Sequence, residues 1–167
     1  ARHCCIAETA AIISLCGHVK ISSQDRFSVK INTENIAVAR KYFTLLKKTF
    51  IIGTDVKKLL QAIKVCDGEK QIRTLQEGVN PMLIKNSCCR RAYLRGAFLC
   101  VGSMSDPQKS YHLEFVFSNY ETASCVSDLL TVVGFLPKLT ERKDSFIVYF
   151  KNGDEINIRV KYFSAYG

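Results

Sequence analysis

The chain of 167 residues is 47% hydrophobic and 23% charged and has a formal net charge of +9, which is typical of one globular domain or of two similar halves. No apolar run reaches the roughly 20 residues that cross a bilayer, and no signal peptide is recognisable, so we expect no membrane segment. The positive charge favours a polyanionic partner, most often a nucleic acid, over an anionic membrane surface or a merely basic protein.

The first part of the chain is predicted to form a helix, a hairpin and two more helices. Residues 4–17 are small and apolar and contain no proline, which favours a helix. Residues 19–21 and 27–31 alternate on either side of a polar turn and predict a β-hairpin with one buried face. Thr33 is the predicted N-cap of a helix over residues 34–49. The predicted inward side chains of the hairpin and this helix are Phe27, Val29, Ile31, Ile36, Ala39, Tyr42, Phe43 and Leu46.

The middle of the chain is less regular. Residues 50–52 begin a strand that stops at Gly53, and residues 55–65 predict an amphipathic helix. Residues 66–87 are polar, contain glycine and proline breakers, and predict a linker with room for a short helix over 70–77. The inward side chains of the 55–65 helix are predicted to be Val56, Leu59, Leu60 and Ile63.

The last part of the chain repeats the order of the first. A helix over residues 88–102 precedes a turn at 105–108 and a strand over 111–117. Ser118 or Asn119 caps a helix over 120–133 that ends at Gly134. Residues 136–140 and 146–150 predict a hairpin, and the alternation in 155–163 favours a strand. Predicted core positions are Leu113, Phe115, Phe117, Ala123, Val126, Leu129, Leu130 and Val133.

The two helices that open the halves match each other. Shifted by 85 positions, Cys4 falls on Cys89, Ala7 on Ala92, Ala11 on Gly96 and Gly17 on Gly102. A stripe of small residues lets two helix backbones approach closely, and glycine inside a helix costs about 1 kcal/mol relative to alanine, so Gly96 is expected to have a packing role. This internal repeat predicts that the two helices pack side by side between two half-domains.

The eight cysteines do not follow a metal-binding or disulfide pattern. The pairs 4–5 and 88–89 are adjacent instead of spaced as C-x-x-C, and Cys16, Cys100 and Cys125 lie in apolar helical contexts where a thiol acts as a small hydrophobe. We therefore predict free structural thiols, no metal and no cofactor, in a cytoplasmic, nucleoid-associated protein. Zinc binding and redox chemistry are the minor alternatives.

The residues from Cys88 to Leu99, Cys-Cys-Arg-Arg-Ala-Tyr-Leu-Arg-Gly-Ala-Phe-Leu, and the segment 102–114 that follows resemble a known family. The duplicated order of elements resembles the LAGLIDADG homing endonucleases. The motif itself more closely resembles the WhiA family of sporulation and cell-division regulators of Gram-positive bacteria, with support from residues 7–8, 10–13 and 33–35. The resemblance extends over residues 3–152.

This resemblance implies an α+β fold with a pseudo-two-fold duplication, in which paired central helices lie between antiparallel sheets covered by helices on one face. It divides the chain into a first LAGLIDADG-like half (1–65), a linker (66–87) and a second half (88–167). It also implies a bacterial transcription factor whose C-terminal helix-turn-helix domain recognises double-stranded DNA. We identify no helix-turn-helix in these 167 residues.

The resemblance also bears on catalysis. LAGLIDADG nucleases hold divalent metal ions with one carboxylate at the C-terminal end of each paired helix. Those acidic positions fall on Cys16 and Val101, and an earlier acidic position falls on Ser14 and Leu99. A valine cannot bind a hard cation, and a thiol is a poor magnesium ligand. We therefore predict no catalytic residues, no metal and no enzyme activity, with the scaffold retained.

Other polar residues have simpler interpretations. Asp106 is expected to start an Asp-Pro turn, and Glu8 to lie near a helix start where a negative charge suits the macrodipole. His3, His18 and His112 have no evident nucleophile or metal partners.

Candidate DNA contacts follow from strand alternation. In the implied fold, the sheet faces opposite to the helices form a saddle on DNA, and basic side chains there contact phosphates with little sequence information. Glu114 lies on the same face and weakens this hypothesis locally. The alternative for each residue is a solvated surface charge. The candidates are Lys20, Arg26, Lys30, Lys138, Arg142 and Lys143.

A second basic cluster consists of Arg90, Arg91 and Arg95. It could bind phosphate, dock another protein or pair with carboxylates inside the domain. The leading hypothesis is a non-catalytic, DNA-associated regulatory domain. The alternatives are a module that docks a protein partner or its own helix-turn-helix domain, and an active homing endonuclease.

Overall fold

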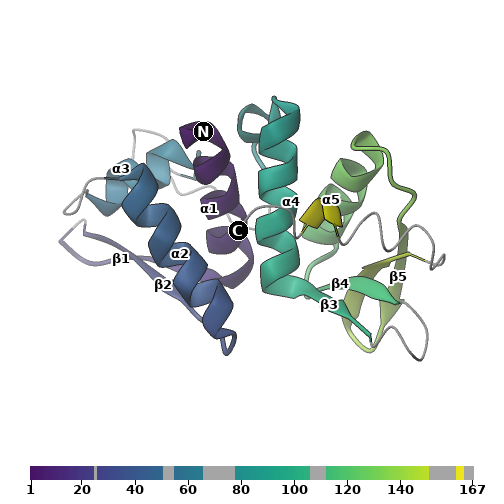
Figure 1. Cartoon of the computed structure of the whole chain (residues 1–167). Coiled ribbons are helices and arrows are strands. Elements are labelled where there is room, and N and C mark those ends of the chain that lie inside the picture. The colour runs from purple at the N-terminus through teal and green to yellow at the C-terminus, as the bar shows by residue number, and fades with distance from the viewer. Residues whose placement is uncertain (25, 51–54, 66–77, 106–111, 151–160, 164–167) are drawn as a thin grey trace.

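The computed structural model describes residues 1–24, 26–50, 55–65, 78–105, 112–150 and 161–163. The first half contains α1 (Arg2–Cys16), β1 (Gly17–Ile21), β2 (Phe27–Ile31), α2 (Ile36–Thr49) and α3 (Val56–Ala62). The second half contains the 3-10 helix η1 (Pro81–Ile84), α4 (Ser87–Val101), β3 (Gly102–Met104), β4 (Leu113–Phe117), α5 (Tyr120–Val132), β5 (Lys138–Arg142) and β6 (Ser145–Tyr149). Figure 1 shows α1 and α4 in the middle, with one sheet on either side.

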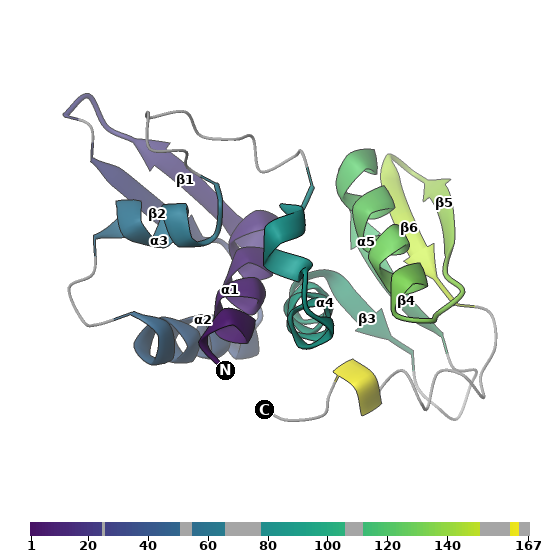
Figure 2. The same ribbon diagram turned by 90° about the horizontal axis from the view of Figure 1, so that it is seen from above.

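Helices α1 and α4 pack side by side, as the repeat predicts (Figures 1 and 2). A Cβ atom added at Gly96 would lie 2.8 Å from the Glu8 carbonyl oxygen and 3.0 Å from the Ala11 Cβ. Real Cβ atoms do not approach a backbone atom so closely, and a packed core has no room to relax. Glycine at this position therefore permits the close approach of the two helices.

The two sheets differ in size. In the first half β1 and β2 form a two-stranded antiparallel hairpin, whereas β3, β4, β6 and β5 form a four-stranded antiparallel sheet in that order. Lys143 and Asp144 both have positive φ in the β5–β6 turn, the backbone form whose twist suits a two-residue hairpin loop. Leu113, Phe115 and Phe117 point into the core, as predicted.

The core lies between the helices and the inner faces of the sheets. It joins both halves through residues of α1 and α4, so the two halves share one hydrophobic cluster. In Figure 2, α5 lies against its sheet, and α3 lies over the β1–β2 hairpin. Among the helices that the structure describes, none combines the length and the apolar character needed to cross a bilayer.

The inward face predicted for α2 is partly wrong. The helix begins two residues later than predicted, because the Asn35 side chain and not Thr33 accepts the capping hydrogen bond, from the Ala37 amide. Ile36 and Phe43 are 68% and 62% exposed. The buried stripe is Val38, Tyr42, Leu45 and Thr49. Since α2 has apolar residues on two adjoining faces, its contact with α1 decides which face is buried.

Most other element predictions are confirmed. Asn119 caps α5 through a hydrogen bond from the Thr122 amide, and Gly134 beyond its end has a φ of +97°. The C-terminal segment is different: residues 161–163 are helical, although alternation predicted a strand through them. Phe163 is buried there and stacks on Phe98, so aromatic packing overrides the alternation.

Several other predictions fall outside the described residues. These are the strand at 51–52, the short helix at 70–77, the Asp-Pro turn from 106 and the strand at 155–160. The division of the chain into 1–65, 66–87 and 88–167 stays a prediction.

Candidate functional site

A cavity of about 750 Å³ lies at the C-terminal ends of α1 and α4. The helix ends contribute Ser14, Cys16 and Val101, and the second half contributes Ser118 and Ser145. This is the place where the LAGLIDADG resemblance puts metal-binding carboxylates. No aspartate or glutamate is among the described residues that line the cavity. Hard divalent cations in such nucleases are held by carboxylates, and neither the Cys16 thiol nor the Val101 side chain supplies one.

Cys16 and Cys100 interact at the same helix ends. A hydrogen bond with Cys100 lowers the pKa of the Cys16 thiol, and the same contact, together with burial, raises the pKa of Cys100. Both cysteines contact the hydrophobic core. The two thiols therefore fill the space between the helix tips as a packed pair.

The outer face of the β1–β2 hairpin is basic. His18 lies opposite Lys30 and Lys20 lies opposite Ser28 in the ladder, and all four residues are exposed. Arg26 is also exposed, one residue before β2. Val19, Phe27, Val29 and Ile31 contact the core instead, whereas Ile21 is 44% exposed. Among the described residues of this hairpin none is acidic, so its predicted DNA contacts Lys20, Arg26 and Lys30 share one positive surface.

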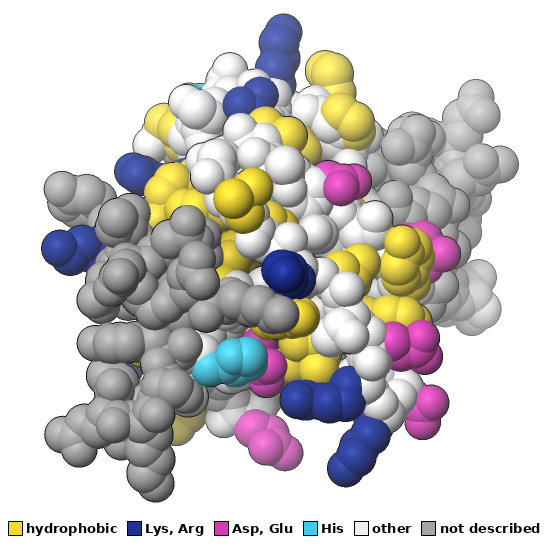
Figure 3. All heavy atoms as spheres, turned by 90° about the vertical axis from the view of Figure 1, so that its right-hand side faces the viewer, with side chains coloured by type: hydrophobic (Ala, Val, Ile, Leu, Met, Phe, Trp, Pro, Cys, Tyr) yellow, Lys and Arg dark blue, Asp and Glu magenta, His cyan; other side chains and the backbone are white. Residues whose placement is uncertain are grey.

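The outer face of the second sheet has mixed charge. Glu114, Tyr149 and Lys138 lie in one cross-strand row. The Glu114 carboxylate lies 2.8 Å from His112 Nε2, and Glu114 is mostly covered. Arg142 and Lys143 are exposed at the end of the β5–β6 hairpin. Figure 3 shows basic, acidic and hydrophobic side chains interspersed on this end of the molecule.

The second basic cluster is used within the chain. Arg95 donates two hydrogen bonds to Glu8, at 3.0 Å from Nε and 2.8 Å from a terminal nitrogen, and Lys41 lies 3.5 Å from the same carboxylate. The hydrogen bonds to Glu8 raise the pKa of Arg95. Glu8 is 2% exposed and lies in the middle of α1, so the helix-dipole interpretation of this residue is wrong. The ion pair connects α1 to α4 and α2.

The other two arginines also have partners in the chain. Arg90 donates to the carbonyl oxygens of Ile84 and Lys85, both at 3.0 Å. The Arg91 guanidinium lies 4.5 Å from the centre of the Tyr162 ring, which is a cation–π contact. Among the described residues, Arg95 pairs with a carboxylate, whereas Arg90 and Arg91 contact backbone carbonyl oxygens and an aromatic ring.

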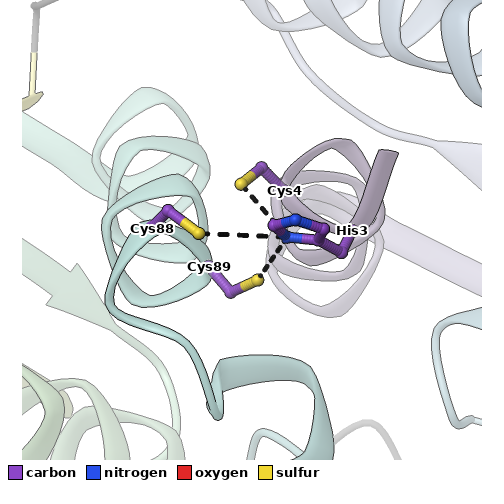
Figure 4. Close-up of side chains that lie close together, drawn as sticks. All are labelled: His3, Cys4, Cys88 and Cys89. Atoms are coloured by element: carbon purple, nitrogen blue, oxygen red, sulfur yellow. Dashed lines mark hydrogen bonds between the residues drawn. The ribbon is translucent and has the colours of Figure 1, made fainter. Parts of the chain in front are cut away.

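A cluster that the sequence did not predict lies at the opposite ends of the paired helices. His3 and Cys4 at the start of α1 meet Cys88 and Cys89 at the start of α4 (Figure 4). Burial raises the pKa of Cys4 to about 12, and a hydrogen bond with Cys4 lowers the pKa of Cys88. Spacing within one helix gave no indication of this group. The 85-residue repeat could have indicated it, since it matches His3 with Cys88 and Cys4 with Cys89 at the same end of the two helices.

The architecture has close counterparts among solved structures. The crystal structure of the N-terminal LAGLIDADG domain of DUF199/WhiA matches with a TM-score of 0.67 at 18% identity, over 99% of this chain and 85% of that one. The homing endonuclease I-DmoI, crystallised in complex with DNA and Mn, matches with a TM-score of 0.63 at 13% identity over the full length of both chains. The fold is therefore that of the LAGLIDADG proteins, shared by nucleases and other proteins.

The sequence comparisons define the family. The model of the WhiA N-terminal LAGLIDADG-like domain matches residues 2–62, and that of the WhiA LAGLIDADG-like domain matches residues 90–161. The chain belongs to the WhiA family. It is 41% identical to the "Probable cell division protein WhiA" of Lachnoclostridium phytofermentans and 38% identical to that of Alkaliphilus oremlandii, in each case over 93% of this chain. The chain spans 57% and 56% of the length of these relatives.

Proposed function

We propose that this chain is a non-catalytic, DNA-associated regulatory domain of a bacterial transcription factor that controls cell division and sporulation. The observation that carries the proposal is the cavity at the ends of α1 and α4, which Cys16 and Val101 line and whose described lining contains no carboxylate. The LAGLIDADG resemblance puts the nuclease carboxylates at these two positions. The names of the relatives support a role in cell division. A scaffold without metal-binding carboxylates can still bind a duplex, because binding and cleavage use different side chains.

The DNA contact is proposed to lie on the outer faces of the two sheets. The β1–β2 face offers Lys20, Arg26 and Lys30 without a neighbouring carboxylate among the described residues of the hairpin. Cations in such an arrangement bind phosphates and release counterions, which makes affinity strongly salt-dependent and weakly sequence-dependent. Sequence recognition would then come mainly from a helix-turn-helix domain, which the family resemblance implies for the longer protein. Such binding places the protein on the nucleoid.

A salt series tests DNA association. The affinity of the chain for a fluorescent duplex of about 25 base pairs would be measured from 25 to 300 mM NaCl, values chosen to span the range where phosphate contacts weaken. We expect log K to fall linearly with log salt, with a slope of about −3 or steeper, since three hairpin cations each contribute about −0.9. Equal affinity for scrambled duplexes is expected. Absence of binding at the lowest salt would contradict the proposal.

A cleavage assay tests the absence of catalysis. Supercoiled plasmid would be incubated with the chain and Mg²⁺ or Mn²⁺, and nicked and linear products would be quantified. We expect no conversion above a protein-free control, because the described lining of the cavity offers no carboxylate to hold the metal ions. Cleavage that a chelator abolishes, in a preparation where Ser14→Ala also abolishes it, would establish an endonuclease instead.

A second candidate function is a docking module for a protein partner or for the helix-turn-helix domain of the same protein. It is favoured by a groove of about 680 Å³ between η1 and α5 that includes Ile84, Tyr120 and Val132. Tyr120 and Val132 are 52% and 63% exposed, which is unusual for large apolar side chains at one site. The same salt series distinguishes the candidates, because a docking module would not bind duplex DNA at low salt.

A further inference from the structure

The cluster at the N-terminal ends of α1 and α4 brings four metal-ligating side chains together. Its ligand atoms are His3 Nδ1 and the sulfur atoms of Cys4, Cys88 and Cys89, and all lie within 4.8 Å of one another. Figure 4 shows the four side chains pointing toward a common centre, two from each helix. Cys88 is exposed and Cys89 is buried, so the cluster lies at the surface with one side against the core.

Hydrogen bonds to the His3 ring do not by themselves account for this arrangement. His3 Nδ1 lies 3.1 Å from the Cys89 sulfur, 3.4 Å from that of Cys4 and 3.9 Å from that of Cys88. A ring nitrogen of neutral imidazole either donates one hydrogen or accepts one, so at most one of these contacts is a hydrogen bond at a time. Thiols are weak donors and weak acceptors besides. A cation at the centre would interact with all four atoms at once.

The distances suit a single small cation. Zinc–sulfur bonds of about 2.3 Å and zinc–nitrogen bonds of about 2.0 Å, in a tetrahedron, separate nitrogen from sulfur by about 3.5 Å and two sulfurs by about 3.8 Å. The three nitrogen–sulfur distances of 3.1, 3.4 and 3.9 Å lie on both sides of the first value. An iron–sulfur cluster is a poorer fit, since its ligands bind different irons and lie farther apart.

We propose that His3, Cys4, Cys88 and Cys89 form a structural zinc site that fastens the N-terminal ends of α1 and α4 together. Zn²⁺ is a borderline-soft cation and binds well to one nitrogen and three sulfur ligands. Mg²⁺ and Ca²⁺ are hard cations that bind oxygen ligands instead. Four protein ligands complete a tetrahedron and leave no open position, which is the pattern of structural and not catalytic zinc. Binding converts three thiols to thiolates and releases their three protons to solvent, leaving the imidazole neutral.

The internal repeat explains how the site is built. Under the 85-residue shift His3 corresponds to Cys88 and Cys4 to Cys89, so each helix supplies the same two adjacent positions. Backbone N–H groups at the start of a helix favour negative charge, and two helix starts meet here. The site lies at the end of the helix pair opposite to Cys16 and Val101, and it would stabilise the junction of the halves without contacting the cavity.

The test measures metal content in the whole chain, purified under reducing conditions with a tag that contains no histidine. Elemental analysis is expected to find about one zinc ion per chain. Addition of Co²⁺ to the metal-free protein is expected to give intense thiolate-to-cobalt absorption and the visible bands of tetrahedral cobalt. Removing the metal with a chelator is expected to lower the Tm by about 5 °C or more, because an ion that binds only the folded state stabilises it.

Variants locate the site. Cys88→Ser removes a ligand that is exposed, so it leaves the fold intact while zinc content falls below about a tenth of the wild-type value. The matched control is Cys5→Ser, which changes the thiol next to Cys4 but no ligand, and which is expected to retain zinc and the cobalt spectrum. Zinc retained in Cys88→Ser, or no zinc and no cobalt spectrum in the wild type, would overturn the proposal. A disulfide between α1 and α4 that persists in the wild type purified under reducing conditions would also overturn it.

Discussion

The two halves of the molecule agree in their helices and differ in their sheets. Helices α1 and α4 share small residues at matching positions, whereas β1–β2 is a two-stranded hairpin and β3–β6 is a four-stranded sheet. Gly96 contacts its own repeat position, Ala11, across the helix pair, so the size of each side chain limits the other. The exposed residues on the outer faces of the strands have no such packing restriction. Close packing therefore restricts residue size in the helix pair and not on the exposed strands.

Charge follows the same division. Among the described residues, the outer face of β1–β2 carries Lys20 and Lys30 and no carboxylate, whereas the outer face of the second sheet includes Glu114 beside Lys138 and Tyr149. Positive charges on one face add to the attraction for DNA, whereas neighbouring negative charges reduce it. The first half should therefore supply most of the electrostatic affinity for DNA. Substitutions are expected to have their largest effects in the buried helix pair and their smallest effects on the sheets.

The largest loss of unfolding free energy is expected at Glu8, where the two paired helices have different residue types at matching positions. Glu8 is a buried carboxylate, and its repeat position in the second half is the buried Tyr93. Glu8→Ala leaves Arg95 without its bidentate partner, and breaking a buried pair costs about 3–5 kcal/mol. Since Arg95 is partly exposed, we expect about 3 kcal/mol of lost unfolding free energy, measured by urea denaturation.

A control for Glu8→Ala is Lys41→Ala. Lys41 makes one contact of 3.5 Å with Glu8 and its side chain is 24% exposed, so its loss should cost less than about 1 kcal/mol. Equal effects of the two substitutions would show that the Arg95 pair is not what joins the helices.

A smaller effect is expected at the closest approach of the helices. Gly96 and Ala11 are repeat equivalents, and a Cβ at Gly96 would meet Ala11 at 3.0 Å. Gly96→Ala gains about 1 kcal/mol of helix propensity but overpacks the interface by about 1–3 kcal/mol, so we expect a net loss of up to about 2 kcal/mol in thermal or urea unfolding.

The reciprocal substitution sharpens this test. Ala11→Gly in the Gly96→Ala background removes one of the two clashes but itself costs about 1 kcal/mol of helix propensity. The double variant should therefore lose less unfolding free energy than the sum of the two single variants, which is a partial recovery relative to that sum. The Glu8 carbonyl oxygen, 2.8 Å from the added Cβ, keeps the recovery incomplete. A Gly96→Ala variant more stable than the wild type would refute the close contact.

The smallest expected change in free energy is in the binding of DNA. The experiment compares the two sheets directly. Two triple variants each remove three positive charges, and the salt dependence of duplex binding is measured for both. The two sets are Lys20→Gln with Arg26→Gln and Lys30→Gln, and Lys138→Gln with Arg142→Gln and Lys143→Gln. The first set is expected to reduce the steepness of log K against log salt by about 2–3 and the affinity about tenfold. The second set is expected to change the steepness by about 1 or less.

Because both triple variants change net charge equally, a general charge effect would alter their binding equally. That result would show that the two halves contribute equally to DNA affinity. Circular dichroism of both variants is expected to match the wild type, since all six side chains are exposed.

Much of the architecture could be predicted from local patterns. Alternation placed Leu113, Phe115 and Phe117 in the core, and an Asn before an apolar run predicted the cap of α5. These features depend on neighbouring residues alone. The buried face of α2 could not be predicted in the same way, because two apolar faces adjoin and only packing on α1 selects one of them.

The candidate site was predicted in part. The repeat located Cys16 and Val101 at the helix tips that line the cavity, and alternation placed Lys20 and Lys30 on the outer face of the hairpin. The interpretation of the arginine cluster depended on residues far away in sequence. Arg95 finds Glu8 across 87 positions, which no periodicity within α4 indicates.

The duplicated helix pair and the inward faces of the strands could be predicted from the sequence, because each follows from residue type and spacing along one element. The positions of the missing carboxylates followed from the family resemblance. The partner of Arg95, the buried face of α2 and the meeting of His3 and Cys4 with Cys88 and Cys89 became visible in the folded chain. Those contacts depend on how two helices rotate and slide against each other. Side-chain packing across the whole core sets that geometry, and it leaves no trace in the local pattern of either helix.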